Sequence, residues 1–219
     1  MSNARDRILE RVRAALRTAP PDAGPVVPRD YRQQSDVDQA DIQAEFIAKV
    51  RDYQALVEEV AEADLPGATL AICRERGVRR LAAPEDLPAD WLPSQVEILR
   101  DAPSLTSEAL ELCDGVLTCC ALAIAETGTL VLDGGARQGR RVLTLLPDLH
   151  LCVVFADQIV GMVPEALAWL STRAKRPITF ISGPSATSDI ELSRVEGVHG
   201  PRTLVVLIIT NGRAADSHD

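Results

Sequence analysis

The sequence predicts an α/β protein built on an open, mostly parallel sheet, and three observations support this fold class. Hydrophobic residues make up 46% of the 219-residue chain and aromatic residues only 3%, so the core must be aliphatic. An aliphatic core is typical of helices packed on a parallel sheet. A helix-like stretch at residues 163–173 separates strand-like runs, which is the alternation of βαβ units. The strand-like runs are 116–120, 129–132, 151–155, 178–181 and 204–209.

The N-terminal segment predicts an arm and a linker. Residues 2–18 form an amphipathic helical pattern with Ile8, Val12 and Leu16 on one stripe. This stripe either docks onto a partner chain or a second copy, which would make a homo-oligomer, or lies on its own domain. Residues 19–35 contain four prolines and a glycine, so they cannot be helical. We therefore expect an arm and linker over 1–35, an α/β domain over 36–212 and a polar tail over 213–219.

Apolar spacing predicts the next elements. A helix is expected from about residue 36 to Leu65, where Pro66 and Gly67 end it. The elements expected after it are a helix over 68–76, strands over 78–82 and 96–99, and a helix over 108–113 capped by Thr106 or Ser107.

Composition excludes several classes of protein. The net charge is −9, and residues 36–114 alone carry a net −11, which argues against nucleic-acid binding. No apolar run is long enough for a membrane span, and the N-terminus lacks a hydrophobic signal core, so we expect a cytoplasmic protein. The five cysteines contain no CxxC and are interpreted as reduced thiols, so no iron–sulfur cluster is expected in this chain. Scattered histidines also argue against a metal site.

Glu126 is the first candidate for a functional side chain. It stands in AETGTLVL (125–132), between an apolar run and a β-rich run, and Gly128 permits a tight turn. A carboxylate in this position is costly to bury without a partner. Glu126 is therefore either a surface turn residue or a functional acid.

Small polar residues follow two of the strand-like runs. DGGARQGRR (133–141) follows the first, and its Arg137, Arg140 and Arg141 either clamp a carboxylate or phosphate or form a solvated turn. SGPS (182–185) follows the second and is expected to lead into a short helix that ends at Gly197. Ligands of open α/β sheets bind beyond the carboxyl ends of strands, and a helix start exposes N–H groups to an anion. The alternative for SGPS is an ordinary helix cap.

Two histidines adjoin these segments. His199 precedes the Gly200-Pro201 turn and is either a general acid/base or a structural donor. His150 opens a strand and is interpreted as a structural, hydrogen-bonded residue.

Four segments together resemble the LUD-domain family, and within it the lactate-utilisation branch. They are AIAETGTLVL (123–132), LPDLH (146–150), ISGPSATSDIE (181–191) and GVHGP (197–201). The resemblance implies a fold similar to the sugar-phosphate isomerase and CoA-transferase group. It also implies a part in oxidising L-lactate to pyruvate alongside iron–sulfur partner proteins, with no cofactor in this chain. The chain's own role stays open between a subunit of the oxidising system, an accessory or assembly protein, and a CoA-transferase-like or isomerase-like enzyme.

The resemblance also implies a site for a small anionic ligand. Glu126 and His199 are the expected catalytic residues, and CoA-transferases suggest Glu126 as a nucleophile by analogy. Two departures stand out: Ala186 occupies a position where Arg or Lys is usual, and Cys119–Cys120 stand where small or acidic residues are usual. The binding residues that the resemblance implies are Thr127, Gly128, Ser182, Gly183, Ser185, Thr187, Asp189 and Gly200. The basic turn after residues 129–132 adds Arg137 and Arg140 to the expected binding residues.

Overall fold

The computed structural model describes residues 4–18, 28, 30–173, 176–187, 195–196 and 200–210. The chain divides into two compact units, Met1–Arg32 and Gln33–Asp219. The first unit contains α1 (Ala4–Thr18), so the predicted N-terminal helix is present. Its apolar stripe is exposed, because Ile8, Val12 and Leu16 keep 61%, 49% and 69% of their surface.

The second unit is built on a six-stranded sheet in the order β1-β12-β7-β4-β2-β3, in which every adjacent pair is parallel. The open, mostly parallel sheet predicted from the sequence is therefore confirmed. The central strands β7 and β12 are buried on both faces, which explains why they read as continuous apolar runs. The strands are β1 (Leu56–Val60), β2 (Arg80–Ala83), β3 (Glu97–Arg100), β4 (Gly115–Cys119), β7 (Leu149–Phe155) and β12 (Thr203–Ile209).

The described part of the second unit has four helices, which surround its strands. Thr106 caps α4 as expected, because its hydroxyl accepts a hydrogen bond from the Ala109 N–H at 3.2 Å. The helices are α2 (Gln39–Asp52), α3 (Leu65–Glu75), α4 (Ser107–Glu111) and α5 (Val163–Ser171). Single 3-10 turns are η1 (Glu62–Asp64), η2 (Ala89–Trp91), η3 (Arg141–Thr144) and η4 (Ala156–Gln158).

A smaller four-stranded sheet packs against the first, in the order β8-β5-β6-β9. Here β6 is antiparallel to both β5 and β9, while β5 and β8 are parallel. The strands predicted at 129–132 and 178–181 therefore exist. The βαβ pattern placed them in the parallel sheet, and this placement was wrong, because both belong to the smaller sheet. The strands are β5 (Leu122–Ile124), β6 (Thr129–Leu132), β8 (Ile159–Val160) and β9 (Thr179–Ile181).

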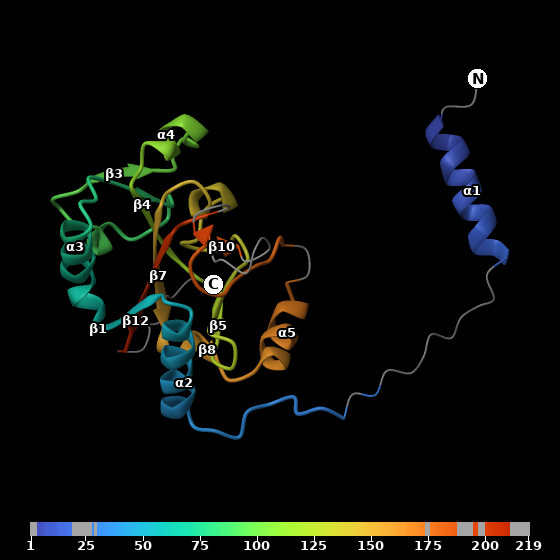
Figure 1. Ribbon diagram of the computed structural model, residues 1–219, viewed down its shortest axis with the longest axis horizontal. Coiled ribbons are helices and arrows are strands. Elements are labelled where there is room, and N and C mark those ends of the chain that lie inside the picture. The colour runs from blue at the N-terminus through green and yellow to red at the C-terminus, as the bar shows by residue number, and fades with distance from the viewer. Residues whose placement is uncertain are drawn as a thin grey trace. The chain divides into compact units, whose positions relative to one another are not determined.

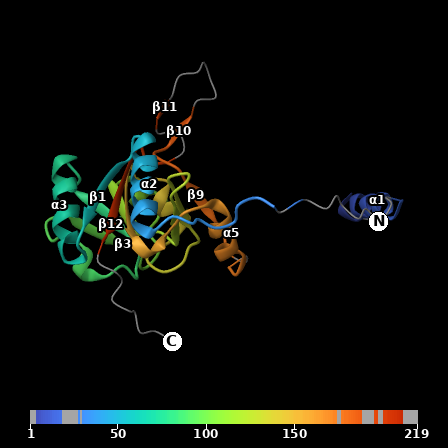
Figure 2. The same cartoon turned by 90° about the horizontal axis from the view of Figure 1, so that it is seen from below.

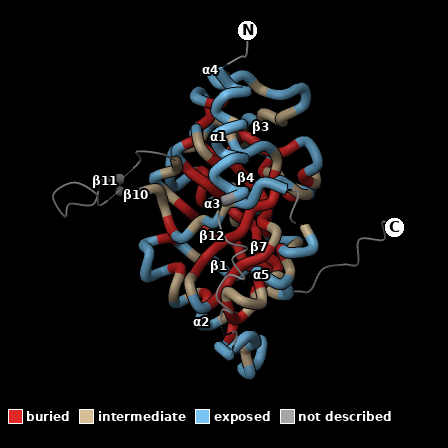
Figure 3. Tube along the Cα trace, turned by 90° about the vertical axis from the view of Figure 1, so that its right-hand side faces the viewer, coloured by how far each residue is buried: buried red, intermediate tan, exposed pale blue. Residues whose placement is uncertain are grey.

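Alternating side chains divide the core into layers. Leu151 and Val153 of β7 belong to the cluster with α3, whereas Cys152 and Val154 belong to the cluster with α2 and the smaller sheet. α5 packs on the far face of β5 and β6. Figures 1 and 2 both show α3 and α5 on opposite sides of the strands, and Figure 3 shows that burial is concentrated in the strands.

The helix predicted from residue 36 to Leu65 is wrong in its second half. α2 ends at Asp52, Gln54 takes a left-handed φ of 64°, and Leu56–Val60 forms β1. β1 pairs with β12 from Leu56↔Val205 to Val60↔Ile209. The apolar residues of β1 also fit helical spacing, and pairing with the distant strand β12 determines that they form a strand.

The short helix predicted between SGPS and Gly197 is also wrong at both of the places where the structure describes this stretch. Ala186–Thr187 is a strand, β10, paired antiparallel with β11 (Val195–Glu196) in a ribbon that stands away from the sheets (Figure 2). Residues 188–194 and 197–199 lie outside the described residues. A helix N-terminus therefore does not follow SGPS directly.

The adjacent Cys119 and Cys120 have a structural explanation. Cys119 ends β4 and Cys120 follows it directly, and the two side chains pack into the clusters on opposite faces of the six-stranded sheet. All five cysteines are buried free thiols, and burial raises the pKa of Cys73 to about 11. Within the described ranges, no helix is long and apolar enough to cross a membrane, and no cluster of metal-ligating side chains occurs.

Candidate functional site

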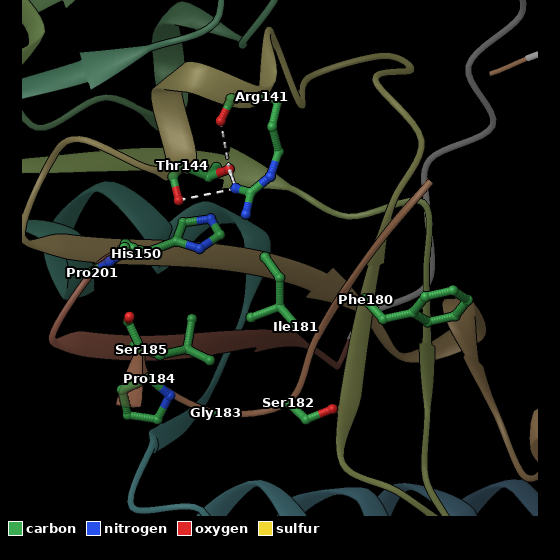
Figure 4. Close-up of a pocket in the computed structure, with 12 residues that line it drawn as sticks. Arg141, Thr144, His150, Phe180, Ile181, Ser182, Gly183, Pro184, Ser185 and Pro201 are labelled. Atoms are coloured by element: carbon green, nitrogen blue, oxygen red, sulfur yellow. Dashed lines mark hydrogen bonds between the residues drawn. The ribbon is translucent and has the colours of Figure 1, made fainter. Parts of the chain in front are cut away.

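A pocket of about 230 Å³ lies between the loop after β9, the 3-10 turn η3 and the first residues of β7 and β12 (Figure 4). His150 and Leu204, which pair across β7 and β12, contribute its wall from the six-stranded sheet. The pocket therefore lies at the carboxyl end of β9, as expected for SGPS, and at the amino-terminal ends of β7 and β12, which was not expected. The lining residues are Arg141, Thr144, His150, Phe180, Ile181, Ser182, Gly183, Pro184, Ser185, Gly200, Pro201 and Leu204.

The antiparallel pairing of β6 and β9 explains why two of the recognised motifs meet. The turn before β6 and the loop after β9 lie at the same end of the pair, because Leu130 faces Ile181. The Thr129 hydroxyl is 2.7 Å from the Ser182 hydroxyl and 2.7 Å from the Thr127 hydroxyl. A line of three hydroxyls thus connects the AETGT turn to the pocket.

Two glycines hold these loops against the end of α2. Gly128 has a φ of 57°, and a Cβ there would lie 2.8 Å from the carbonyl carbon of Lys49. Gly183 has a φ of 85°, and a Cβ there would lie 2.6 Å from the Cβ of Tyr53. Both positions combine left-handed backbone with close approach, so only glycine fits without a shift.

Arg141 is the cationic side chain of the pocket. Its Nη1 group donates to the Thr144 carbonyl at 3.1 Å and to the Thr144 hydroxyl at 2.6 Å. No carboxylate pairs with Arg141 among the residues that the structure describes. Burial lowers the pKa of the guanidinium, yet an arginine remains charged at ordinary pH. The pocket therefore holds a positive charge that no protein carboxylate in the described ranges neutralises.

His150 is a buried neutral base in the same wall. It keeps 1% of its surface, and its Nε2 lies 2.8 Å from the hydroxyl of the fully buried Thr118. Burial and the charge of Arg141 lower the pKa of His150 to about 3. The imidazole is therefore neutral at ordinary pH, and it offers the pocket a hydrogen bond without adding charge.

Four of the residues predicted for the site line this pocket: Ser182, Gly183, Ser185 and Gly200. The Ser185 N–H already donates to the Pro201 carbonyl at 2.8 Å, so it holds the loop closed instead of facing outward. Thr127 reaches the pocket only through the hydroxyl line.

Three further predicted residues have other roles in the structure. Glu126 is exposed at the turn between β5 and β6, where its carboxylate accepts the Val163 N–H at the start of α5 at 3.3 Å. It does not line the pocket. Arg140 forms two 2.7 Å hydrogen bonds with Asp101. The Arg137 guanidinium lies 5.2 Å from the Trp91 ring centroid.

The remaining predictions fall on less described segments. Thr187 is placed in β10 by its backbone, and Asp189 and His199 lie outside the described residues. Their roles stay predictions.

Sequence reasoning missed Thr144 and His150 as site residues. It chose Arg137 and Arg140 as binding residues, whereas Arg141 is the arginine that lines the pocket. One signal was present, because LPDLH is among the recognised motifs and ends on His150. The interpretation of His150 as a hydrogen-bonded strand residue was correct, but the pattern could not show that the ring faces a cavity.

Fold and pocket together define an α/β domain with a small cavity that a cationic arginine and a neutral histidine line. Residues 44–209 match the LUD domain family, and the chain therefore belongs to the LUD-domain family. The family expected from the four motifs is thus confirmed.

Individual relatives agree with this assignment. The chain is 44% identical over 211 residues to lactate utilization protein C of Deinococcus radiodurans, covering 95% of this chain and 96% of the relative. It is 25% identical over 232 residues to lactate utilization protein C of Geobacillus thermodenitrificans, covering 94% and 96%. A crystal structure of a DUF162 family protein from Deinococcus radiodurans matches with a TM-score of 0.69 and 41% identity, covering 80% of this chain and 99% of that one.

Proposed function

We propose that this chain is a component of L-lactate utilisation that acts with iron–sulfur partner proteins in the oxidation of L-lactate to pyruvate. The names of the relatives support the process, since two of them are called lactate utilization protein C. Within this process, the chain binds a small anionic ligand in the Arg141 pocket. The iron–sulfur clusters belong to the partner proteins, and a cytoplasmic location stays a prediction.

The unpaired guanidinium of Arg141 carries the proposal of an anion site. A charge without a counter-ion in a concave site is stabilised by an anionic ligand, and arginine binds carboxylates with two parallel hydrogen bonds. Nη1 is already bonded to Thr144, so the Nε and Nη2 groups are the pair that faces a carboxylate. Phe180, Ile181 and Leu204 supply apolar wall for a short carbon chain.

Calorimetric titration of the purified chain with pyruvate and with L-lactate tests this site. Arg141→Gln removes the charge, and we expect it to weaken binding at least about tenfold, since a charge-assisted pair contributes about 1.5–3 kcal/mol. Arg80→Gln is the matched control, because Arg80 pairs with Glu97 outside the pocket. Equal affinities in the parent chain and Arg141→Gln would exclude this pocket as the anion site.

A second role, as an accessory or assembly protein, is favoured by the exposed apolar stripe of α1. Ile8, Val12 and Leu16 lie on a helix that also carries five arginines, which suits a partner with an acidic, apolar groove. Deletion of residues 1–20 followed by co-purification with the iron–sulfur proteins tests this role. Undiminished co-purification would exclude α1 as the docking element.

A further inference from the structure

The hydrogen bond between Thr118 and His150 decides which nitrogen of the imidazole carries the proton. Both side chains are buried, and within the described part of the chain each is the other's hydrogen-bond partner. A buried hydroxyl whose hydrogen finds no acceptor destabilises the fold. The Thr118 hydroxyl therefore donates to Nε2, and Nε2 must be the unprotonated nitrogen of the neutral ring. The proton of the imidazole is then on Nδ1.

The Nδ1–H group is left for the pocket. It has no hydrogen-bond partner among the described residues, and His150 lines the cavity. Figure 4 shows the His150 ring beside the Arg141 guanidinium, with the Ser182–Ser185 loop on its other side. His150 keeps only 1% of its surface, so a donor on its ring that faces the cavity takes its acceptor from whatever fills that cavity.

The donors of the pocket can be matched to a ligand. The free Nε and Nη2 groups of Arg141 satisfy the two oxygens of one carboxylate. Nδ1–H of His150 then requires a third oxygen on the same small molecule. Arg141 supplies one positive charge and His150 none, so a singly charged ligand leaves no unbalanced charge on the described lining.

We propose that the pocket recognises a monocarboxylate that carries a further oxygen on the carbon next to the carboxylate, that is, a 2-oxo or 2-hydroxy acid. Below, this atom is called the second oxygen. His150, held by Thr118 in the Nδ1–H form, donates to this second oxygen and is a specificity-determining residue. The proposal rests on the anion site proposed above and adds the chemistry by which that site selects its ligand. An acid without the second oxygen leaves Nδ1–H buried and unpaired, and polar sites reject such analogues strongly.

The tautomer can be measured without any ligand. Long-range proton–nitrogen NMR on the ¹⁵N-labelled chain shows which ring nitrogen is protonated, and His150→Gln identifies the His150 signals among the three histidines. We expect a proton on Nδ1 in the parent chain and in Thr118→Ser, which keeps the hydroxyl. A proton on Nε2 in the parent chain would overturn the proposed role of Thr118 and His150.

Isosteric ligands test the selectivity. Isobutyrate replaces the hydroxyl of L-lactate by a methyl group, and propionate lacks the oxo group of pyruvate. We expect each to bind at least about tenfold more weakly than its oxygenated counterpart, because the unpaired donor costs about 1–3 kcal/mol. Thr118→Val should reduce this discrimination and Thr118→Ser should retain it, with thermal unfolding confirming that both variants fold.

The outcomes separate this inference from the proposed site. Equal binding of isobutyrate and L-lactate that still depends on Arg141 would overturn the selectivity and leave the anion site standing. Binding of none of the four acids would overturn both.

Discussion

Protonation of His150 should make the protein lose stability between about pH 6.5 and pH 3. In the folded chain the pKa of His150 is about 3, because burial and Arg141 oppose the charged form, whereas its ordinary value is 6.5. Below pH 6.5 the unfolded chain binds a proton that the folded chain does not bind. The stability is therefore fully present above pH 6.5 and is lost progressively as the pH falls toward 3.

The size of the effect follows from the difference in pKa. Each pH unit below 6.5 favours the unfolded state by about 1.4 kcal/mol until the folded-state pKa is reached. At pH 5 the loss is about 2 kcal/mol relative to neutral pH, a large fraction of a typical folding free energy. Hydrogen bonds from arginines lower the pKa values of Asp101 and Asp148. These two groups change the stability only below about pH 3.8, their ordinary pKa, so they do not contribute to the loss at pH 5.

Denaturant unfolding at pH 7 and pH 5 measures this loss in the parent chain and in His150→Gln. The variant lacks the titrating ring, so its stability should fall by about 2 kcal/mol less between the two pH values. His199 and His218 are common to both proteins, and their contributions cancel in the comparison. Equal losses in the two proteins would refute the assignment of His150 as a buried neutral base.

Three further substitutions and one chemical modification have definite expected outcomes. Gly183→Ala should destabilise the fold by about 1–3 kcal/mol and weaken pyruvate binding, because the new Cβ would lie 2.6 Å from Tyr53. Gly67→Ala in α3 should stabilise the fold by about 0.5–1 kcal/mol, because nothing lies within 4 Å of the new Cβ. Denaturant unfolding measures both effects. Glu126→Gln should lower the unfolding free energy by at most about 1 kcal/mol and leave calorimetric pyruvate affinity unchanged, because Glu126 caps α5; a large loss of affinity would contradict this role. The five buried thiols should react with a thiol reagent such as DTNB only after unfolding, and rapid reaction of the native chain would contradict their burial.

Local patterns predicted the elements that depend on near neighbours. The helix over α1, the cap at Thr106 and the strands β4, β6, β7, β9 and β12 follow from spacing and composition. β1 could not be predicted in this way, because its residues also fit a helix and only pairing with β12 selects the strand. The antiparallel direction of β6 and β9 likewise depends on which sheet they join. The sequence of a single strand does not determine that choice.

The sequence predicted only part of the site, namely the residues that belong to recognisable local motifs. Ser182, Gly183, Ser185 and Gly200 belong to recognisable motifs and lie together in the pocket. Glu126 was the most conspicuous candidate, yet its carboxylate lies on the N-terminus of α5. Whether a polar residue faces a cavity depends on the register of distant strands, and this is why His150 became a candidate only in the folded structure.

The two outermost strands of the large sheet bear on how copies of this protein can meet. On β1, Glu58 and the neighbouring Glu59 project to opposite faces, and Glu59 accepts a hydrogen bond from Gln43 at 2.8 Å. On β3, Glu97 forms an ion pair with Arg80 at 3.0 Å. A strand added at either border would have to approach carboxylates, which is how natural sheets resist edge-to-edge aggregation. The chain can therefore keep long, mainly apolar central strands without its sheet acting as a template for polymerisation.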